Sequence, residues 1–190
     1  SARVADACLR AGATMINDVS ALGDPAMAQV AADHGCDLVL MHMRGTPTNM
    51  NSHANYHHLL GEIADEWMAS MSQALAAGVS AKKIHMDPGV GFAKNGQQSL
   101  AILNQLSSLR SLGFPLLVGP SRKSFLEQAL GERSPQQREA GTTGAAALCA
   151  AQGVATLRLH QGQPHWDAAR VARACAQAET RLTSAPEAKP

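Results

Sequence analysis

The chain has 190 residues, of which 45% are hydrophobic and 16% are charged, so it is long and apolar enough to bury a substantial core. Its formal net charge is +1, and its aromatic residues are two Trp, one Tyr and three Phe. This composition excludes a disordered chain, a basic nucleic-acid-binding surface and an aromatic platform for stacking bases, so we expect no nucleic acid partner.

The cysteines of the chain are widely spaced and form no C-x-x-C pair; they are Cys8, Cys36, Cys149 and Cys175. This usage predicts a reduced protein of the cytoplasm. The sequence has no apolar run of membrane-spanning length and no signal peptide, so no membrane association is expected. It opens on Ser1, without Met and inside a helical pattern, which predicts a fragment or a processed start.

The first half of the sequence alternates between helical and strand patterns. Residues 1–10 carry apolar side chains at helical spacing. Asp24 and Pro25 predict a helix start, as N-cap and first-turn residues. In chain order, we expect a helix at 1–10, a strand at 13–17, a helix at 24–35, a strand at 37–41, a polar loop at 45–54 and a long helix at 56–77.

The second half continues the alternation. In chain order, we expect a strand at 83–86, a helix at 98–112, a strand at 116–118, a short helix at 125–130, a charged loop at 131–139, a helix at 140–152, a strand at 154–160 and a helix at 166–181. The Ala- and Pro-rich residues 183–190 predict a disordered tail, which leaves residues 1–182 as one domain.

Alternating strands and helices predict an α/β fold with a parallel sheet. Polar residues follow each predicted strand, and a TIM (β/α)8 barrel places its catalytic groups in this way, on one rim and from several strands. An open doubly wound sheet would gather them at one switch point instead. We therefore expect an incomplete TIM barrel of about five βα units that lacks its N-terminal strands, since a complete barrel has eight strands.

A carboxylate and an amide at two strand ends are candidates for binding a heterocycle. Asp87 begins the phrase D-P-G-V-G-F, in which Gly89 and Gly91 allow close approach of backbone to a ligand. Its carboxylate suits a bidentate pairing with an aminopyrimidine edge, and the amide of Asn17 suits the same edge. The alternative for both is a structural turn residue, with Asn17 and Asp18 in an Asx-turn.

Cationic groups at the two following strand ends suit an anionic ligand. Lys123 lies between hydroxyl and guanidinium groups in the phrase G-P-S-R-K-S at 119–124, which otherwise indicates a solvated turn. Arg158 and His160 are two positions apart and share one strand face, which fits a phosphate or diphosphate. The alternative for Arg158 is a surface ion pair.

Histidines are the remaining candidates, for a metal. His85 shares a strand face with Asp87, so a metal pair is one reading, but a lone strand histidine is more often structural. His42, His57 and His58 have no metal-binding spacing.

Five short phrases, taken together, resemble dihydropteroate synthase, a pterin-binding TIM-barrel family of the folate pathway and a sulfonamide target. They are I-N-D-V at 16–19, L-M-H-M at 40–43, D-P-G-V-G-F at 87–92, G-P-S-R-K-S at 119–124 and R-L-H at 158–160. The resemblance implies a transferase that condenses 4-aminobenzoate with a (7,8-dihydropterin-6-yl)methyl diphosphate, with Mg²⁺ on the diphosphate, to give 7,8-dihydropteroate and diphosphate. It also implies a homodimer, because family members are commonly dimers.

The resemblance further implies roles for particular residues. Asn17 and Asp87 would hold the pterin edge. Lys123 would lie over the pterin ring, with Ser124 near the aminobenzoate carboxylate. The other substrate-binding residues would be Phe92 on the aminobenzoate side, Arg158 and His160 on the diphosphate, and Gly119. The catalytic set would be Lys123, Arg158 and His160.

Two departures from the family pattern follow. Gln161 stands where the family's last motif has an Asp, which removes the expected support of His160. The family's N-terminal phrases, with the magnesium-binding Asn, the mobile loops and a further pterin-binding Asp, are absent, so we expect no metal ligand in this chain and a shortened synthase.

Two alternative functions stay open at this point. A methyltetrahydrofolate-dependent methyltransferase of the same pterin-binding kind would share the Asn and Asp contacts but would not need Lys123 and Ser124. A catalytically silent barrel fragment would leave unpaired strand edges, which predicts poor solubility or oligomerisation.

Overall fold

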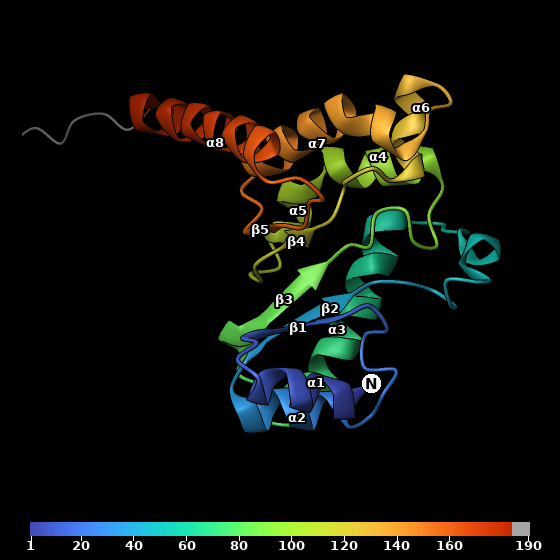
Figure 1. Ribbon diagram of the computed structural model, residues 1–190, viewed down its shortest axis with the longest axis vertical. Helices are drawn as coiled ribbons and strands as arrows, with labels where there is room; N and C mark the ends of the chain where they lie inside the picture. Colours follow the sequence, from blue (N-terminus) through green and yellow to red (C-terminus); the bar gives the residue numbers. More distant parts are fainter. Residues whose placement is uncertain (184–190) are drawn as a thin grey trace, which may run out of the picture.

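The computed structural model describes residues 1–183, so the expected tail at 184–190 lies outside the described residues. Parallel strands in chain order form its centre (Figure 1). The first sheet pairs β1 (Met15–Asp18) with β2 (Asp37–Met41) and β2 with β3 (Ile84–Asp87). The second pairs β4 (Leu117–Val118) with β5 (Thr156–Leu157), and a parallel bridge from Met86 to Leu116 joins the sheets. The predicted α/β class with parallel strands is confirmed.

Helices connect successive strands and cover the sheet. The α-helices are α1 (Ala2–Arg10), α2 (Met27–His34), α3 (Leu59–Ala76), α4 (Gly96–Asn104), α5 (Leu106–Arg110), α6 (Glu127–Leu130), α7 (Glu139–Ala151) and α8 (Gln163–Thr183). Short 3₁₀ turns cover Met50–His53, Ala81–Lys83, Ser124–Leu126 and Pro135–Arg138. Helices α1 and α2 lie at one end of the molecule in Figure 1, and α7 and α8 lie at the other. In residues 1–183, no helix has the length and apolar character needed to cross a membrane.

The predicted helix at 98–112 is wrong as a single element. It breaks at Gln105, between α4 and α5, and Leu106 and Leu109 of the second segment are buried. The side chain of Gln152 compensates for the break, because its Nε2 donates to the Leu103 carbonyl (2.5 Å) and its Oε1 accepts from the Ser107 N–H (3.2 Å). A distant side chain thus takes up backbone groups that an unbroken helix would pair internally.

The predicted strand at 154–160 is also wrong in length. Only Thr156 and Leu157 form the ladder, because the neighbouring strand β4 is itself ended by Gly119 and Pro120. The last pairing is the bond from the Arg158 N–H to the Val118 carbonyl (3.0 Å). Arg158 and His160 therefore lie just beyond the strand. At the C-terminus, α8 includes Thr183, which we had expected in the tail.

The strand register decides which side chains share a face. Asn17, Val39 and His85 are level across β1, β2 and β3. Met41 and Asp87 are level two residues further toward the C-terminal ends, on the same face. The opposite face supplies the core, in which these fully buried side chains meet: Leu38, Leu40, Ile63, Trp67, Ile84, Met86, Ile102 and Leu106. Since all strands run the same way, their polar C-terminal residues gather at one edge.

Candidate functional site

A buried carboxylate lies at the centre of this edge. The side chain of Asp87, at the end of β3, is 3% exposed and its Oδ1 accepts the Gly89 N–H at 2.7 Å. Its backbone is fixed, since the Asp87 carbonyl accepts from the His42 N–H (2.8 Å) and from Trp67 Nε1 (3.2 Å). Burial raises the pKa of Asp87, and the cations Lys123, Arg158 and Lys94 oppose that rise. The carboxylate thus faces several positive charges without a direct ion pair among the described residues.

The Lys123 ammonium is the first of these cations. Its Nζ donates to the Val90 carbonyl (2.7 Å) and lies 4.4 Å from the centroid of the Phe92 ring. Gly91 makes room for the lysine, because a Cβ there would come 3.3 Å from Lys123 Cδ at a φ of +77°. Burial lowers the pKa of Lys123 to about 8, which Asp87 partly offsets. The structure therefore brings the predicted residues Asp87, Phe92 and Lys123 together.

Arg158 and His160 lie against β4 and its loop. A Cβ at Gly119 would come 3.1 Å from Arg158 Nη2, so the missing side chain of Gly119 lets the guanidinium lie on the backbone. His160 contacts the buried Ser121, whose Oγ accepts the His160 N–H (3.2 Å) and lies 2.9 Å from Nδ1. The hydroxyl hydrogen is then free to bond Nδ1, which leaves Nε2 as an outward N–H donor. Ser121 supplies the orientation of His160 that we had expected to be missing with Gln161.

The last two predicted residues are exposed. Asn17 is the next-to-last residue of β1, and Ser124 begins the 3₁₀ turn that follows β4, directly after Lys123. The Asx-turn reading applies to Asp18 and not to Asn17: the Asp18 carboxylate accepts from the Ser20 N–H (2.9 Å) and the Leu22 N–H (2.7 Å). The amide of Asn17 therefore remains available to a ligand.

A partly buried network holds the loop that carries Lys123. Arg122 adopts a φ of +58°, a conformation that a residue with a Cβ rarely takes. Its N–H donates to Thr142 Oγ1 (3.0 Å) and its guanidinium pairs with Glu139. Glu139 also pairs with the buried His165 (2.8 Å). Helices α7 and α8 thus enforce the unusual backbone at Arg122 that aims the next residue, Lys123, at the site.

The possible metal pair of His85 and Asp87 does not form. His85 Nε2 lies 3.4 Å from Asp37 Oδ1, at the start of β2, and its Nδ1 is buried without a partner. The structural reading of His85 is the better one. In the described residues, no three His, Cys, Asp or Glu side chains are grouped as a metal would require.

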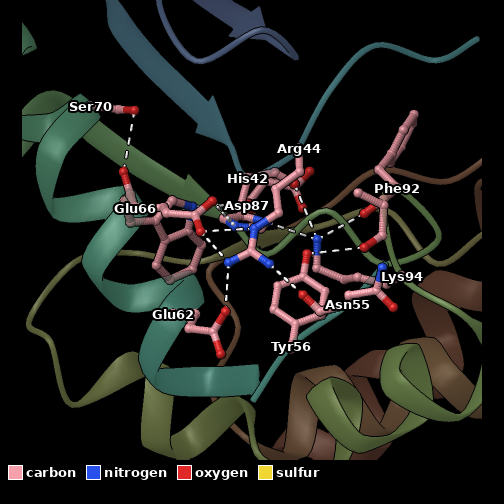
Figure 2. A network of polar contacts seen from close by, with 12 residues as sticks. His42, Arg44, Asn55, Tyr56, Glu62, Glu66, Ser70, Asp87, Phe92 and Lys94 are labelled. Atoms are coloured by element: carbon pink, nitrogen blue, oxygen red, sulfur yellow. Dashed lines mark hydrogen bonds and ion pairs between the residues drawn. The ribbon is translucent and has the colours of Figure 1, made fainter. Parts of the chain in front are cut away.

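The structure adds a second cluster around His42 and Arg44, and its members Lys94 and Glu66 were missed by sequence reasoning (Figure 2). Lys94, only 5% exposed, donates from Nζ to His42 Nδ1 (2.9 Å), and His42 Nε2 contacts Glu66 (3.0 Å). Glu66 pairs with Arg44, which also lies 4.1 Å from the centroid of the Tyr56 ring. The only signal for Lys94 was its place two residues after D-P-G-V-G-F, and Glu66 gave none, being one of several acidic residues in a predicted helix.

Burial also shifts the ionisation of this second cluster. It lowers the pKa of Lys94 to about 7, while Asp87 and Glu66 act in the opposite direction. It lowers the pKa of His42 to about 4, helped by the charge of Lys94. His42 is therefore neutral near pH 7.

Comparison with known proteins gives a consistent family. Residues 1–160 match the model of the family described as pterin-binding enzyme. The dihydropteroate synthase of Synechocystis sp. is 42% identical over 160 residues, which cover 84% of this chain and 55% of that protein.

Solved structures agree with this result. The Yersinia pestis dihydropteroate synthase with a sulfonamide drug complex has a TM-score of 0.89 at 36% identity and covers 93% of this chain. The Thermus thermophilus enzyme in complex with 4-aminobenzoate has a TM-score of 0.85 at 37% identity and covers 92% of this chain. This chain covers 64% of the first structure and 67% of the second, and so spans only part of the length of its relatives. By the family match over most of its length, the chain belongs to the pterin-binding enzymes.

Proposed function

We propose that this chain forms most of the active site of a dihydropteroate synthase, built on the C-terminal portion of a TIM barrel. The observation that carries the proposal is the buried Asp87 carboxylate, which faces Lys123 and Arg158 and has one protein hydrogen bond among the described residues, from Gly89. A carboxylate in such a place binds two adjacent N–H groups of a heterocycle. Parallel strands that follow one another in space in chain order support the barrel.

In this proposal, the pterin lies between Asp87, Asn17 and Lys123. Asp87 accepts hydrogen bonds from the aminopyrimidine edge, and the exposed amide of Asn17 completes that contact. The Lys123 ammonium lies over the pterin ring, as it already does over Phe92. Ser124 and Phe92 bind 4-aminobenzoate, through its carboxylate and its ring.

The leaving diphosphate is assigned to Arg158 and His160. The amino nitrogen of 4-aminobenzoate forms a bond to the pterin methylene carbon as the C–O bond to diphosphate breaks, and the amine then loses a proton. Negative charge grows on the diphosphate in the transition state, and fixed cationic and N–H donors stabilise it there. Gly119 and Ser121 keep those donors in place.

Mg²⁺ has no site of its own among residues 1–183, where no three potential ligand side chains are grouped. Mg²⁺ stays a proposed cofactor, which would be held chiefly by the oxygens of the diphosphate. We route no step through it and assign the charge of the diphosphate to Arg158 and His160.

The proposal also includes a homodimer and a cytoplasmic location. Leu148 on α7, and Trp166 and Val171 on α8, are exposed apolar side chains that suit a contact between copies. The cysteines at 8, 36, 149 and 175 are unpaired, which suits a reducing compartment.

Release of diphosphate tests the proposed function. We expect the complete gene product to release diphosphate only when 4-aminobenzoate and dihydropterin-methyl diphosphate are both present. Arg158→Met should slow release strongly, and Arg3→Met, on the exposed face of α1, should not. Binding of methyltetrahydrofolate without diphosphate release would favour the methyltransferase, and no pterin binding at all would favour the silent fragment.

A further inference from the structure

Lys94 is a buried lysine for which the proposed reaction has no role. Its ammonium has three acceptors: His42 Nδ1 (2.9 Å), the His42 carbonyl (3.3 Å) and the Phe92 carbonyl (2.9 Å). An ammonium has three N–H donors, so the protein uses all of them. Lys94 therefore has no donor left for a substrate and acts, if at all, through its neighbours.

The partners of Lys94 form a continuous chain of polar contacts, as Figure 2 shows. Because His42 accepts at Nδ1, its hydrogen is on Nε2, which donates to Glu66 Oε2 at 3.0 Å. Glu66 is held from the other side by Arg44. A neutral imidazole between an ammonium and a carboxylate thus fixes the direction of each bond in the chain.

This chain of polar contacts ends on the loop that connects Asp87 to α4. Lys94 binds the carbonyl of Phe92, and Lys123 binds the carbonyl of Val90 at 2.7 Å, so two lysines hold alternate peptide groups of the loop. The loop lies tightly on β2, since a Cβ at Gly89 would come 2.1 Å from the His42 carbonyl oxygen. Ala93 has a φ of +49°, an unfavourable backbone for alanine that needs such external support.

We propose that Lys94 is a positioning residue of the active site: its ammonium clamps the loop of residues 88–94 to the end of β2 and so fixes the Phe92 ring and the Val90 carbonyl against which Lys123 lies. This inference rests on the proposed synthase function and adds a residue to that site. The bonds that hold Asp87 do not include Lys94: its carbonyl accepts from Trp67 Nε1 and from the His42 N–H, and its carboxylate accepts from the Gly89 N–H. Loss of the clamp therefore displaces the Phe92 ring, on the aminobenzoate side, more than the Asp87 carboxylate, on the pterin side.

The test is Lys94→Met in the complete gene product. Methionine keeps the apolar stem, and removal of a buried charge offsets the unpaired acceptors, so the variant should stay folded by thermal melting. We expect kcat/KM for 4-aminobenzoate to fall about tenfold or more, while Kd for dihydropterin-methyl diphosphate, measured by calorimetry, changes less than about threefold. Lys82→Met, which alters an exposed lysine, is the matched control and should change neither value.

Two results would overturn the positioning role. One is a folded Lys94→Met protein with unchanged kcat/KM, and the other is an equal loss of pterin binding and thermal stability, which would mark a general structural role. If Lys94→Met does not fold, Glu66→Gln is the deciding variant, because it removes the charge that His42 contacts on the side away from Lys94. We expect kcat/KM for 4-aminobenzoate to be about threefold lower in this variant. An unchanged value would refute the clamp. Failure of the unaltered protein to bind the pterin would instead refute the proposed function.

Discussion

The carboxylate of Asp87 offers the sharpest test of the site, through the substitution Asp87→Asn. Asparagine has nearly the same shape, but it replaces one acceptor oxygen by an NH₂ group. The Gly89 N–H, which lies 2.7 Å from Oδ1, would keep its hydrogen bond to the one oxygen that asparagine retains. The NH₂ group would then face the N–H groups of the pterin, donor against donor.

The magnitude follows from the bonds that are lost. A hydrogen bond to a charged group contributes about 1.5–3 kcal/mol, and the substitution removes one such bond and weakens another. A loss of about 3 kcal/mol corresponds to a rise in Kd of roughly a hundredfold. Burial raises the pKa of Asp87, so above the ordinary carboxyl pKa its charge lowers the stability of the folded state. Asp87→Asn removes that charge, and the variant should therefore stay folded.

The assay is calorimetric titration with dihydropterin-methyl diphosphate, with a thermal melt of each protein beside it. Asp37→Asn is the control, since Asp37 is a half-buried carboxylate at the opposite end of β2, next to Lys83 and His85. If Kd for Asp87→Asn stays within about threefold of the unaltered protein, a difference below about 0.7 kcal/mol, Asp87 does not recognise the pterin and the reasoning fails.

Three further predictions follow from the same geometry. Gly89→Ala should lower both the melting temperature and pterin affinity, because its Cβ would come 2.1 Å from the His42 carbonyl oxygen at a φ of +64°; unchanged values would contradict the tight loop. Lys123 should make kcat/KM fall on the basic side of its pH profile, since burial lowers the pKa of Lys123 to about 8 and its charge is lost as pH rises through that value. Lys123→Arg should move this fall to higher pH, and a fall that stays in place would belong to another group. The Glu62 carboxylate accepts the His58 and His57 N–H groups and pairs with Arg44, and the first of these bonds is the main cause that lowers its pKa to about 2. Its stabilisation is present above the ordinary pKa and is lost as pH falls toward 2, so Glu62→Gln should flatten the acid side of a stability-against-pH curve, and an unchanged slope would refute this.

Local signals in the sequence were sufficient for most of the secondary structure. The strand at 37–41 was predicted with its observed bounds, because a short apolar run between Gly35 and His42 has few other solutions. Gly35 ends α2 with a φ of +57°, the left-handed conformation that glycine adopts readily. The errors lie where distant groups intervene: Gln152 stabilises the break at Gln105, and the short β4 limits the length of β5.

Candidate site residues were also accessible from the sequence when their position alone implied a role. Asp87 is the last residue of β3, and Lys123 and Arg158 follow β4 and β5; parallel strands bring such residues to one edge of the sheet. Ser121, as the support of His160, could not be inferred, because it depends on a contact between loops 39 positions apart.

The sequence by itself therefore determined the α/β class, the order of the strands and the edge at which the polar residues gather, since these depend on local pattern and on strand direction. Only the tertiary structure decided how that edge is held in place. It put Lys94 against His42, 52 positions away, with Glu66 behind them, and it imposed a φ of +58° on Arg122 through helices α7 and α8. Such contacts depend on distances between segments far apart in the chain, and no local preference of the sequence encodes those distances.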